Sequence, residues 1–334
     1  MSTYAAAPIL TEFAQAVACE ARDGLTSNPK RLSPWLFYDE AGSKLFEEIT
    51  RLPEYYLTRT ERQIFTENAD EIIALARAGR CLAIAELGAG TATKTGILLR
   101  AAVREQSQVL YQPIDVSATA LDEARESLEA SIPGVTVRPS IANYVTEPVV
   151  IERPTAARIL ALYIGSSIGN FTPTEARGVL ENLREQLTEG DTLLLGTDLA
   201  PGAHKDKAAL LEAYDDAAGV TAAFNGNILS RLNFDLGADF DLASFRHRAV
   251  WNEADSRIEM YLESLEQQSV YIPANAVCPA LTLEFAAGET IHTENSYKFT
   301  PASIDSLLSD CGFSAVKVFT DARELFAVTL ARAV

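Results

Sequence analysis

Cysteine and histidine are scarce in this 334-residue sequence, and neither forms a local cluster. The four cysteines are Cys19, Cys81, Cys278 and Cys311, and the three histidines are His204, His247 and His292. Because no two cysteines form a C-x-x-C pair, we expect buried free thiols and no redox motif. The isolated histidines lack zinc-ligand spacing, so the sequence predicts no metal site.

Basic residues and long apolar runs are also lacking. Lys and Arg number 28 against 46 Asp and Glu, and the resulting formal net charge of −18 argues against binding to nucleic-acid phosphates. No apolar run approaches the ~18–20 residues of a membrane span. Residues 1–10 lack the basic segment and apolar core of a secretory signal. We expect a cytoplasmic, monomeric protein that binds a small molecule, and neither nucleic acid nor a membrane.

Apolar residues, in contrast, make up 48% of the chain, which is enough for a buried core. The length allows two domains of ~100–200 residues each. From residue 80, short apolar strands alternate with helix-length segments, a pattern typical of parallel β-α-β units. The predicted strands are 82–87, 109–115, 135–138, 158–163 and 192–197. The predicted helices between them include 118–130 and 174–187.

This alternation stops after Asp198. Residues 206–217 are predicted to form a helix that leads into polar segments. Those segments contain Asn225, Asn227 and Asn233.

Residues 258–262 and 281–285 then alternate apolar and polar side chains, which predicts an antiparallel unit. The α/β pattern resumes with a helix at 301–311 and strands at 316–319 and 325–330. Residues 200–296 are therefore predicted to be an insertion before the last strands of the sheet.

The first predicted strand runs into the loop Glu86-Leu87-Gly88-Ala89-Gly90-Thr91. Glycines let the backbone approach a ligand, and a helix beginning near Thr91 offers free N–H groups. A dinucleotide fingerprint has a third glycine where this chain has Thr93, which disfavours a nicotinamide cofactor. Glu86 suits a cofactor that ends in an ammonium-bearing amino acid, as S-adenosylmethionine (SAM) does. A purely structural turn is the alternative.

Asp115 ends the second predicted strand, ~20 or more positions beyond the glycines, where an acidic side chain suits hydrogen bonds to both ribose hydroxyls. Alone, Asp115 could simply cap the helix that begins near Ala118. The combination of Asp115 with the glycine loop favours the nucleoside-binding interpretation.

The fourth predicted strand runs into Gly165-Ser166-Ser167-Ile168-Gly169-Asn170. Ligands of open α/β sheets bind beyond the carboxyl ends of the strands, so this loop should reach the reaction centre. An Asn-containing turn before the helix opened by Thr172 and Pro173 explains it equally well. Two other stretches, 52–59 and 292–299, are suggestive, although packed tyrosines and a solvated edge are simpler interpretations.

In this order the segments resemble the L-histidine Nα-methyltransferases of ergothioneine biosynthesis, from about Lys30 to the C-terminus. Several long motifs in the right order are more specific than one glycine loop. The motifs that carry the resemblance are WLFYD (35–39), ITRLPEYY (49–56), ELGAGT (86–91), GSSIGN (165–170), LGTDL (195–199), AYDDAAGVT (213–221), RIEM (257–260) and TENSYKF (293–299).

The resemblance implies an α/β protein with a Rossmann-like SAM-dependent methyltransferase sheet and a second, mixed α+β substrate-binding domain. The first domain would comprise residues 62–200 and 297–334, and the second residues 1–61 and 201–296. Histidine would bind between them and receive three methyl groups on its α-amine, giving hercynine in the first step of ergothioneine biosynthesis. Related fungal enzymes methylate tryptophan derivatives, so another aromatic amino acid is the alternative substrate.

The resemblance also implies residue roles, carried over by position. Asn170 and Tyr214 would hold the carboxylate and amino end of the substrate, and Tyr38 and Gly165 would lie near the amine. Tyr38 and Asn170 are the predicted catalytic residues. The residues around the imidazole would be Tyr55, Glu294 and Ser296, with Met260 and Phe46 lining the pocket.

The predicted cofactor-binding residues are Glu86, Gly88, Gly90, Lys94, Asp115, Asn143 and Tyr144. Ala142-Asn143-Tyr144 stands where the family has Gly-Asp-Phe. The amide oxygen of Asn143 can still accept a hydrogen bond from the adenine amino group.

Two other function classes are weaker candidates. Thr93 disfavours a nicotinamide-dependent oxidoreductase. A non-catalytic SAM-binding or scaffold protein is disfavoured because cofactor and amino-acid motifs occur in one chain.

Overall fold

The computed structural model describes residues 12–145 and 147–334, which divide into two compact units. The sheet unit consists of Leu57–Asp206 and Tyr297–Val334. The insertion unit consists of the described residues up to Tyr56 together with Lys207–Ser296. Residues 1–10, for which the sequence predicts no secretory signal, lie outside the described residues.

The sheet unit is built around an eight-stranded sheet in the order β13-β14-β7-β6-β2-β3-β4, with β5 beside β3. Its strands are β2 (Leu82–Leu87), β3 (Val109–Asp115), β4 (Val135–Val137), β5 (Ser140–Ile141), β6 (Arg158–Tyr163), β7 (Thr192–Asp198), β13 (Phe313–Thr320) and β14 (Phe326–Ala333). Paired neighbours from β4 through β7 are parallel, whereas β14 is antiparallel to β7 and β13. This parallel-rich sheet confirms the predicted Rossmann-like fold.

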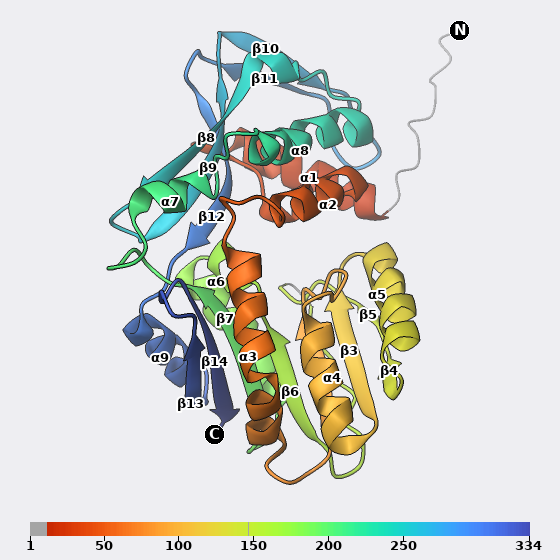
Figure 1. Ribbon diagram of the computed structural model, residues 1–334. Helices are drawn as coiled ribbons and strands as arrows, with labels where there is room; N and C mark the ends of the chain where they lie inside the picture. The colour runs from red at the N-terminus through yellow and green to blue at the C-terminus, as the bar shows by residue number, and fades with distance from the viewer. Residues whose placement is uncertain (1–11, 146) are drawn as a thin grey trace, which may run out of the picture. The chain divides into compact units, whose positions relative to one another are not determined.

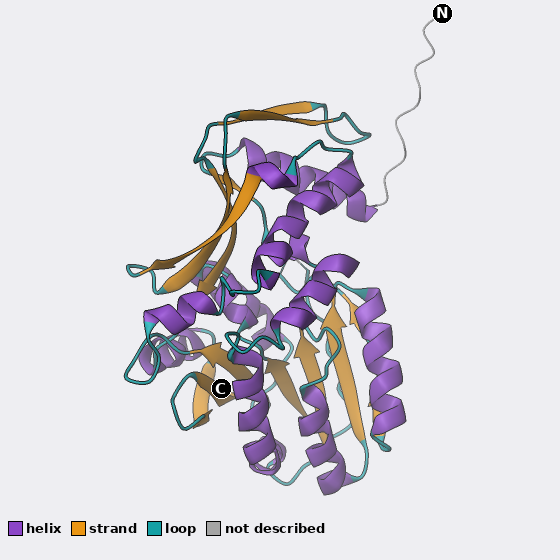
Figure 2. Ribbon diagram, turned by 45° about the horizontal axis from the view of Figure 1, so that its top comes forward, coloured by secondary structure: helices purple, strands orange, loops and turns teal. Residues whose placement is uncertain are grey.

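Helices cover both faces of this sheet (Figures 1 and 2). They are α3 (Leu57–Arg77), α4 (Thr95–Gln106), α5 (Ala118–Ser131), α6 (Pro173–Glu185) and α9 (Pro301–Asp310). One face packs on α6 and α9 in a core that includes Ala85, Leu180 and Leu308. Figure 1 shows α3 and α4 on the other face. Because β2 is covered on both faces, every one of its residues is buried, and all of them except Glu86 are apolar.

The strand order reverses at β2, which pairs in parallel with β3 on one side and β6 on the other. The loops that follow β2 and β6 therefore start next to each other at the carboxyl ends of their strands. Ligands of open α/β sheets bind at such a reversal.

The helix after β2 begins at Thr95, so the prediction of a start near Thr91 is wrong. Ala92 has a φ of +51°, in the left-handed region that a right-handed helix cannot contain. The glycine loop is therefore longer than its glycines alone indicate.

The predicted domain boundaries need correction at two places. Residues 57–61 begin the continuous helix α3, which packs against β6 and β14, so they belong to the sheet unit. Residues 201–206 also belong there. Within this segment Lys205 is buried, with its ammonium 2.6 Å from Asp198 Oδ1 at the end of β7.

The insertion unit contains a four-stranded sheet in the order β1-β12-β9-β8 and a separate antiparallel pair, β10 and β11. The strands are β1 (Lys30–Arg31), β8 (Phe245–Asn252), β9 (Arg257–Ser264), β10 (Gln268–Ile272), β11 (Leu281–Phe285) and β12 (Thr290–Tyr297). The helices are α1 (Glu12–Thr26), α2 (Glu40–Ile49), α7 (Lys207–Glu212) and α8 (Val220–Leu236), with short 3₁₀ turns η1 (Pro34–Phe37) and η3 (Leu242–Ser244). The predicted period-two strands are β9 and β11, each in an antiparallel pair.

Helix α8 is the main element that the sequence did not predict. It covers the segment around Asn225, Asn227 and Asn233, for which the sequence indicated only polar character, and the predicted helix before it is only the short α7. Each asparagine amide has a partner outside the helix: Asn227 donates to Asp39 Oδ1 at 2.9 Å, and Asn233 pairs with the Phe240 backbone. Tertiary hydrogen bonds thus outweigh the weak helix propensity of asparagine.

The expectation of buried thiols holds for Cys311 but is wrong for Cys19 and Cys81, which are exposed, and Cys278 is half-buried. Wide spacing excludes local motifs but says nothing about exposure. Within residues 12–145 and 147–334, no group of three or more His, Cys, Asp or Glu could hold a metal ion. In the same ranges no helix is long and apolar enough to cross a membrane.

Candidate functional site

The glycine loop after β2 reaches across to the end of β3. Gly88 and Gly90 have φ values of +66° and +51°, which favour glycine. Gly88 N–H donates to the Ile114 carbonyl at 2.8 Å, and Gly90 N–H donates to Asp115 Oδ2 at 2.9 Å. A side chain at Gly88 would lie 3.1 Å from the Tyr144 hydroxyl. The structure thus brings four predicted cofactor residues together.

Asp115, predicted to bind ribose, also has a structural role. Its carboxylate accepts from Gly90 N–H and, through Oδ1, from Ser117 N–H at 3.0 Å. The alternative role as N-cap of α5 belongs instead to Ser117, whose hydroxyl accepts from Ala120 N–H. Since a carboxylate has about four acceptor sites, Asp115 keeps capacity for ribose hydroxyls.

Asn143 and Tyr144 follow β5 in the chain, and the Tyr144 hydroxyl lies beside Gly88. Asn143 Oδ1 accepts from Val145 N–H at 3.1 Å, which fixes the amide and leaves a lone pair for an adenine amino group. The Tyr144 ring lies 5.8 Å from that of Tyr163 in an edge-to-face contact. Burial raises the pKa of Tyr144 to about 12, so its phenol is neutral.

The loop after β6 is held in an unusual conformation. Gly165 and Ser166 have φ values of +78° and +60°. Ser166 Oγ accepts from Asp198 N–H at 2.9 Å, and a side chain at Gly169 would lie 2.8 Å from the Tyr297 carbonyl. These contacts position the 3₁₀ turn η2 (Ser167–Asn170), which ends at the half-buried Asn170.

Glu61 joins the two loops, and the sequence did not predict it. This carboxylate on α3 is fully buried. Its oxygens accept from Gly165 N–H at 2.8 and 3.1 Å and form an ion pair with Lys94. These partners are 104 and 33 residues away along the chain, so no local motif could reveal the role of Glu61.

A chain of aromatic contacts in the insertion unit joins four of the residues predicted to surround the substrate, Tyr38, Phe46, Tyr55 and Tyr214. The ring of Tyr55 lies 6.2 Å from Tyr214 and 6.3 Å from Phe46, and Tyr38 lies 5.9 Å from Phe46. Phe224 of α8 packs 6.0 Å from both Tyr38 and Phe46. Because α8 was not predicted, Phe224 was missed.

Polar groups of β12 lie at one end of this aromatic chain. Glu294 and Ser296 are two residues apart in the strand, so their side chains share a face, and they are 8% and 3% exposed. The Ser296 and Tyr214 hydroxyls are 2.8 Å apart. A simpler role for Glu294 would be a salt bridge with Lys298, four residues further along the chain. The Lys298 ammonium lies 2.9 Å from Asp198 Oδ2. Met260 is buried on β9.

Comparison with known proteins now identifies the family. Residues 17–333 match the sequence model of a family described as histidine-specific, SAM-dependent methyltransferases. The chain belongs to this family. Its cofactor is therefore SAM, as the glycine loop and Asp115 predicted.

Similar proteins include two mycobacterial enzymes. The histidine N-alpha-methyltransferase of Mycolicibacterium smegmatis is 43% identical over 318 residues, which cover 95% of each chain. That of Mycobacterium tuberculosis is 40% identical over 308 residues, or 92% of each chain. The ergothioneine biosynthesis protein 1 of Schizosaccharomyces pombe is 28% identical over 304 residues, covering 86% of this chain and 37% of that protein.

In this methyltransferase Glu86, one of the predicted cofactor residues, is buried and has a raised pKa. Glu86 is 2% exposed, and its Oε2 accepts from the Tyr111 hydroxyl and, at 2.7 Å, from Thr95 Oγ1. Burial raises the pKa of Glu86 to about 7, although the two hydroxyls and Lys94 oppose the rise. Since this value exceeds ~4.3, the usual value in an unfolded chain, Glu86 favours folding below about pH 4.3, and this contribution is lost as pH rises through 7.

We expect SAM and S-adenosylhomocysteine (SAH) to bind more tightly as pH rises through 7. The ammonium group of either ligand would favour ionised Glu86, so binding would release a proton. Calorimetry of SAH binding between pH 6 and 8, in buffers of different ionisation enthalpy, measures this release. Glu86→Gln should bind SAH without it, and an unchanged proton release in that variant would contradict the assignment.

Gly196 of β7 leaves the space that Glu61 occupies. A Cβ at this position would lie 2.2 Å from Glu61 Oε1 and 3.2 Å from Gly165 N. Glu61 could avoid this clash only by moving away from Gly165 N–H. Gly196→Ala would therefore displace the contact that joins the two loops.

We expect Gly196→Ala to lower kcat/KM by about 100-fold, because small displacements of a positioned reaction centre have effects of that size. Gly178→Ala is the matched control, since its Cβ meets no atom within 4 Å on the exposed side of α6. Steady-state kinetics and thermal unfolding of both variants provide the test. Equal activity of the two variants would rule out a role for the Glu61 contact.

Proposed function

We propose that the chain transfers three methyl groups from SAM to the α-amino group of L-histidine, giving hercynine in the first step of ergothioneine biosynthesis. The observation that carries this proposal is the buried set of polar side chains beside the aromatic contacts in the insertion unit. Tyr214 and Ser296 are hydrogen-bonded there, and Glu294 shares a face with Ser296. The names of the two mycobacterial relatives support the same reaction.

In this proposal the insertion unit recognises the amino acid and the sheet unit binds SAM. Tyr55, Glu294 and Ser296 contact the imidazole, while Met260 and Phe46 line the pocket. An imidazole offers one N–H donor and one acceptor nitrogen, which suits a carboxylate and hydroxyls.

Tyr214 and Asn170 hold the carboxylate and amino end of the substrate, with Tyr38 and Gly165 near the amine. SAM contacts residues at the carboxyl ends of β2, β3 and β5. They are Glu86, Gly88, Gly90, Lys94, Asp115, Asn143 and Tyr144.

SAM supplies an electrophilic methyl group on a sulfonium. Only a neutral amine, which has a free lone pair, would accept this methyl group, and the chain's residues would have to hold that amine close and oriented. No strong general base would be needed during the transfer. The neutral hydroxyl of Tyr38 and amide of Asn170 suit this chemistry, whereas a carboxylate beside the amine would favour the unreactive ammonium form.

Mass spectrometry of products from a panel of amino acids incubated with SAM tests the proposal. We expect trimethylated histidine as the main product, with mono- and dimethylated forms at early times. A product from tryptophan and none from histidine would replace this function with the alternative aromatic substrate. Binding of SAH with no product from any amino acid would favour a non-catalytic SAM-binding protein.

A further inference from the structure

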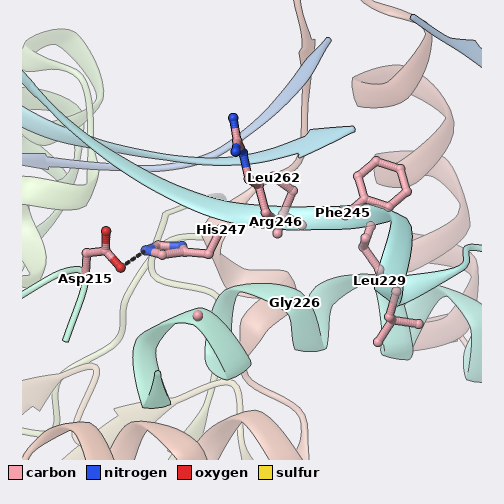
Figure 3. Close-up of a pocket in the computed structure, with 9 residues that line it drawn as sticks. Asp215, Gly226, Leu229, Phe245, Arg246, His247 and Leu262 are labelled. Carbon is pink, nitrogen blue, oxygen red and sulfur yellow. Dashed lines mark ion pairs between the residues drawn. The ribbon is translucent and has the colours of Figure 1, made fainter. Parts of the chain in front are cut away.

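His247 of β8 is one of the isolated histidines of the sequence. In the insertion unit its imidazole contacts the backbone of the predicted substrate residue Tyr214. The His247 side chain is 3% exposed and lines a cavity of about 390 Å³ that is also lined by residues of α8. Figure 3 shows the imidazole pointing toward Asp215, with Nε2 4.0 Å from Asp215 Oδ1. Asp215 directly follows Tyr214 in the chain.

Hydrogen bonds determine the tautomer of His247. Its Nε2 is 2.8 Å from the Tyr214 carbonyl, and its Nδ1 is 2.8 Å from Asn225 Nδ2. Asn225 Nδ2 also donates to the Tyr261 carbonyl at 3.0 Å, and Asn225 Oδ1 accepts from Thr293 Oγ1 at 2.7 Å. With the Asn225 amide fixed at both ends, Nδ1 of His247 must accept, and Nε2–H donates to Tyr214. His247 is therefore neutral in this arrangement.

This network fixes the backbone next to the proposed histidine-binding side chains. His247 holds the carbonyl of Tyr214, and Ser296 bonds the phenol of the same residue. Thr293 Oγ1 lies 2.7 Å from Asn225 Oδ1 and 3.0 Å from the Met260 carbonyl, and Thr293 directly precedes Glu294. The fully buried Asn225 thus connects the strand that carries Glu294 with the imidazole that holds Tyr214.

We infer that His247 is a positioning residue for substrate binding, which acts through its Nε2–H bond to the Tyr214 carbonyl with Asn225 holding the imidazole in the required tautomer. This inference rests on the proposed function, because it takes Tyr214 as a contact of the bound histidine. His247 itself does not touch the substrate or SAM.

Protonation of His247 would disrupt the network, because a proton on Nδ1 would meet the N–H of Asn225. Burial lowers the pKa of His247, while the bond to Tyr214 and the charges of Asp215 and Asp216 oppose this shift. These two carboxylates are the charged groups that face the ring from the segment before α8. The neighbouring helix α8 presents Asn225, and β9 presents Leu262 opposite His247.

Three variants separate the two hydrogen bonds of His247. His247→Phe keeps a ring and removes both bonds. His247→Gln places an amide N–H near the Nε2 position and so keeps the donor to Tyr214. His247→Asn places an oxygen near the Nδ1 position and keeps only the acceptor for Asn225.

We expect His247→Phe to raise KM for histidine about tenfold with little change in kcat, since a buried carbonyl loses its donor. KM of His247→Gln should stay near that of the parent, and KM of His247→Asn should be higher. SAH affinity should be unchanged in all three variants. Parental KM in His247→Phe would overturn the inference. If His247→Phe does not unfold cooperatively, equal KM values for His247→Gln and His247→Asn would overturn it.

Two further readouts separate this inference from the proposed function and from a merely structural role. If the parent enzyme with saturating SAH does not bind histidine in calorimetry, the proposed function fails. As pH falls below 6.5, KM should rise more for the parent than for His247→Gln, because only the parent has an imidazole at position 247 that can be protonated. Ionisation of the substrate affects both enzymes equally and does not change the ratio of their KM values. A constant ratio of the two KM values across this range would contradict the required neutral imidazole.

Discussion

Asn170→Asp should abolish methylation of histidine and should lower activity further than Asn170→Ala. In the proposed function, the amide of Asn170 donates to the carboxylate of the substrate. Alanine removes that donor, whereas aspartate also places a negative charge against the substrate carboxylate. We expect losses in kcat/KM of about 100-fold for Asn170→Ala and about 1000-fold or more for Asn170→Asp.

The conformation of the turn that carries Asn170 does not depend on the Asn170 side chain, so the two variants can be compared directly. The position of Asn170 at the end of η2 depends on contacts made by its neighbours, Ser166 with Asp198 and Gly169 with Tyr297. Substitution of a half-buried side chain at this end should leave the turn in place. Steady-state kinetics with histidine give the loss, and SAH binding in both variants checks the sheet unit. Equal activity of the two variants would mean that Asn170 does not meet a carboxylate.

The sheet unit could be predicted largely from its sequence because its strands are buried on both faces. Such strands are continuous apolar runs, and the predicted bounds of β2, β3 and β6 are confirmed. The glycine loop and Asp115 could also be located, since strand ends in this fold meet at one edge of the sheet. The predicted start of α4 was wrong because the left-handed conformation of Ala92 has no sequence signature comparable to that of glycine.

The parts that the sequence did not predict depend on partners far away in the chain. Helix α8 has no clear apolar stripe, because its buried face includes Asn225, whose partners lie on β8, β9 and β12. Glu61 occurs in an ordinary polar stretch of α3, and only folding brings it to Lys94 and Gly165. Local patterns and the family resemblance together located the residues proposed to contact ligands better than the residues that hold them in place.

Glu294→Ala should reduce methylation of histidine sharply and shift the preference of the enzyme toward tyrosine and tryptophan. In the proposed function the Glu294 carboxylate accepts the imidazole N–H. A site with buried polar groups of this kind can discriminate by ~10⁴ or more against a substrate that leaves them without partners. Tyrosine and tryptophan gain little from the carboxylate, so its removal should lower the activity with histidine most.

The structure supports this prediction through the position of Glu294 on β12. The strand is extended, as predicted, so Glu294 lies on the same face as Ser296, which is bonded to Tyr214. Lys298, considered as a salt-bridge partner for Glu294, is fully buried and forms its ion pair with Asp198. Glu294 therefore shares one face of β12 with Ser296, and it stays in the set proposed to read the imidazole.

Kinetics with histidine, tyrosine and tryptophan for the parent and Glu294→Ala decide the matter. Asn295→Ala is the matched control, because the intervening side chain of Asn295 points to the opposite face of β12 and its Oδ1 lies 3.0 Å from His292 Nε2. We expect this control to leave the ranking of the three amino acids unchanged. A uniform loss on all three substrates in Glu294→Ala, with the ranking of the parent preserved, would show that Glu294 supports the fold of the insertion unit and does not read the imidazole.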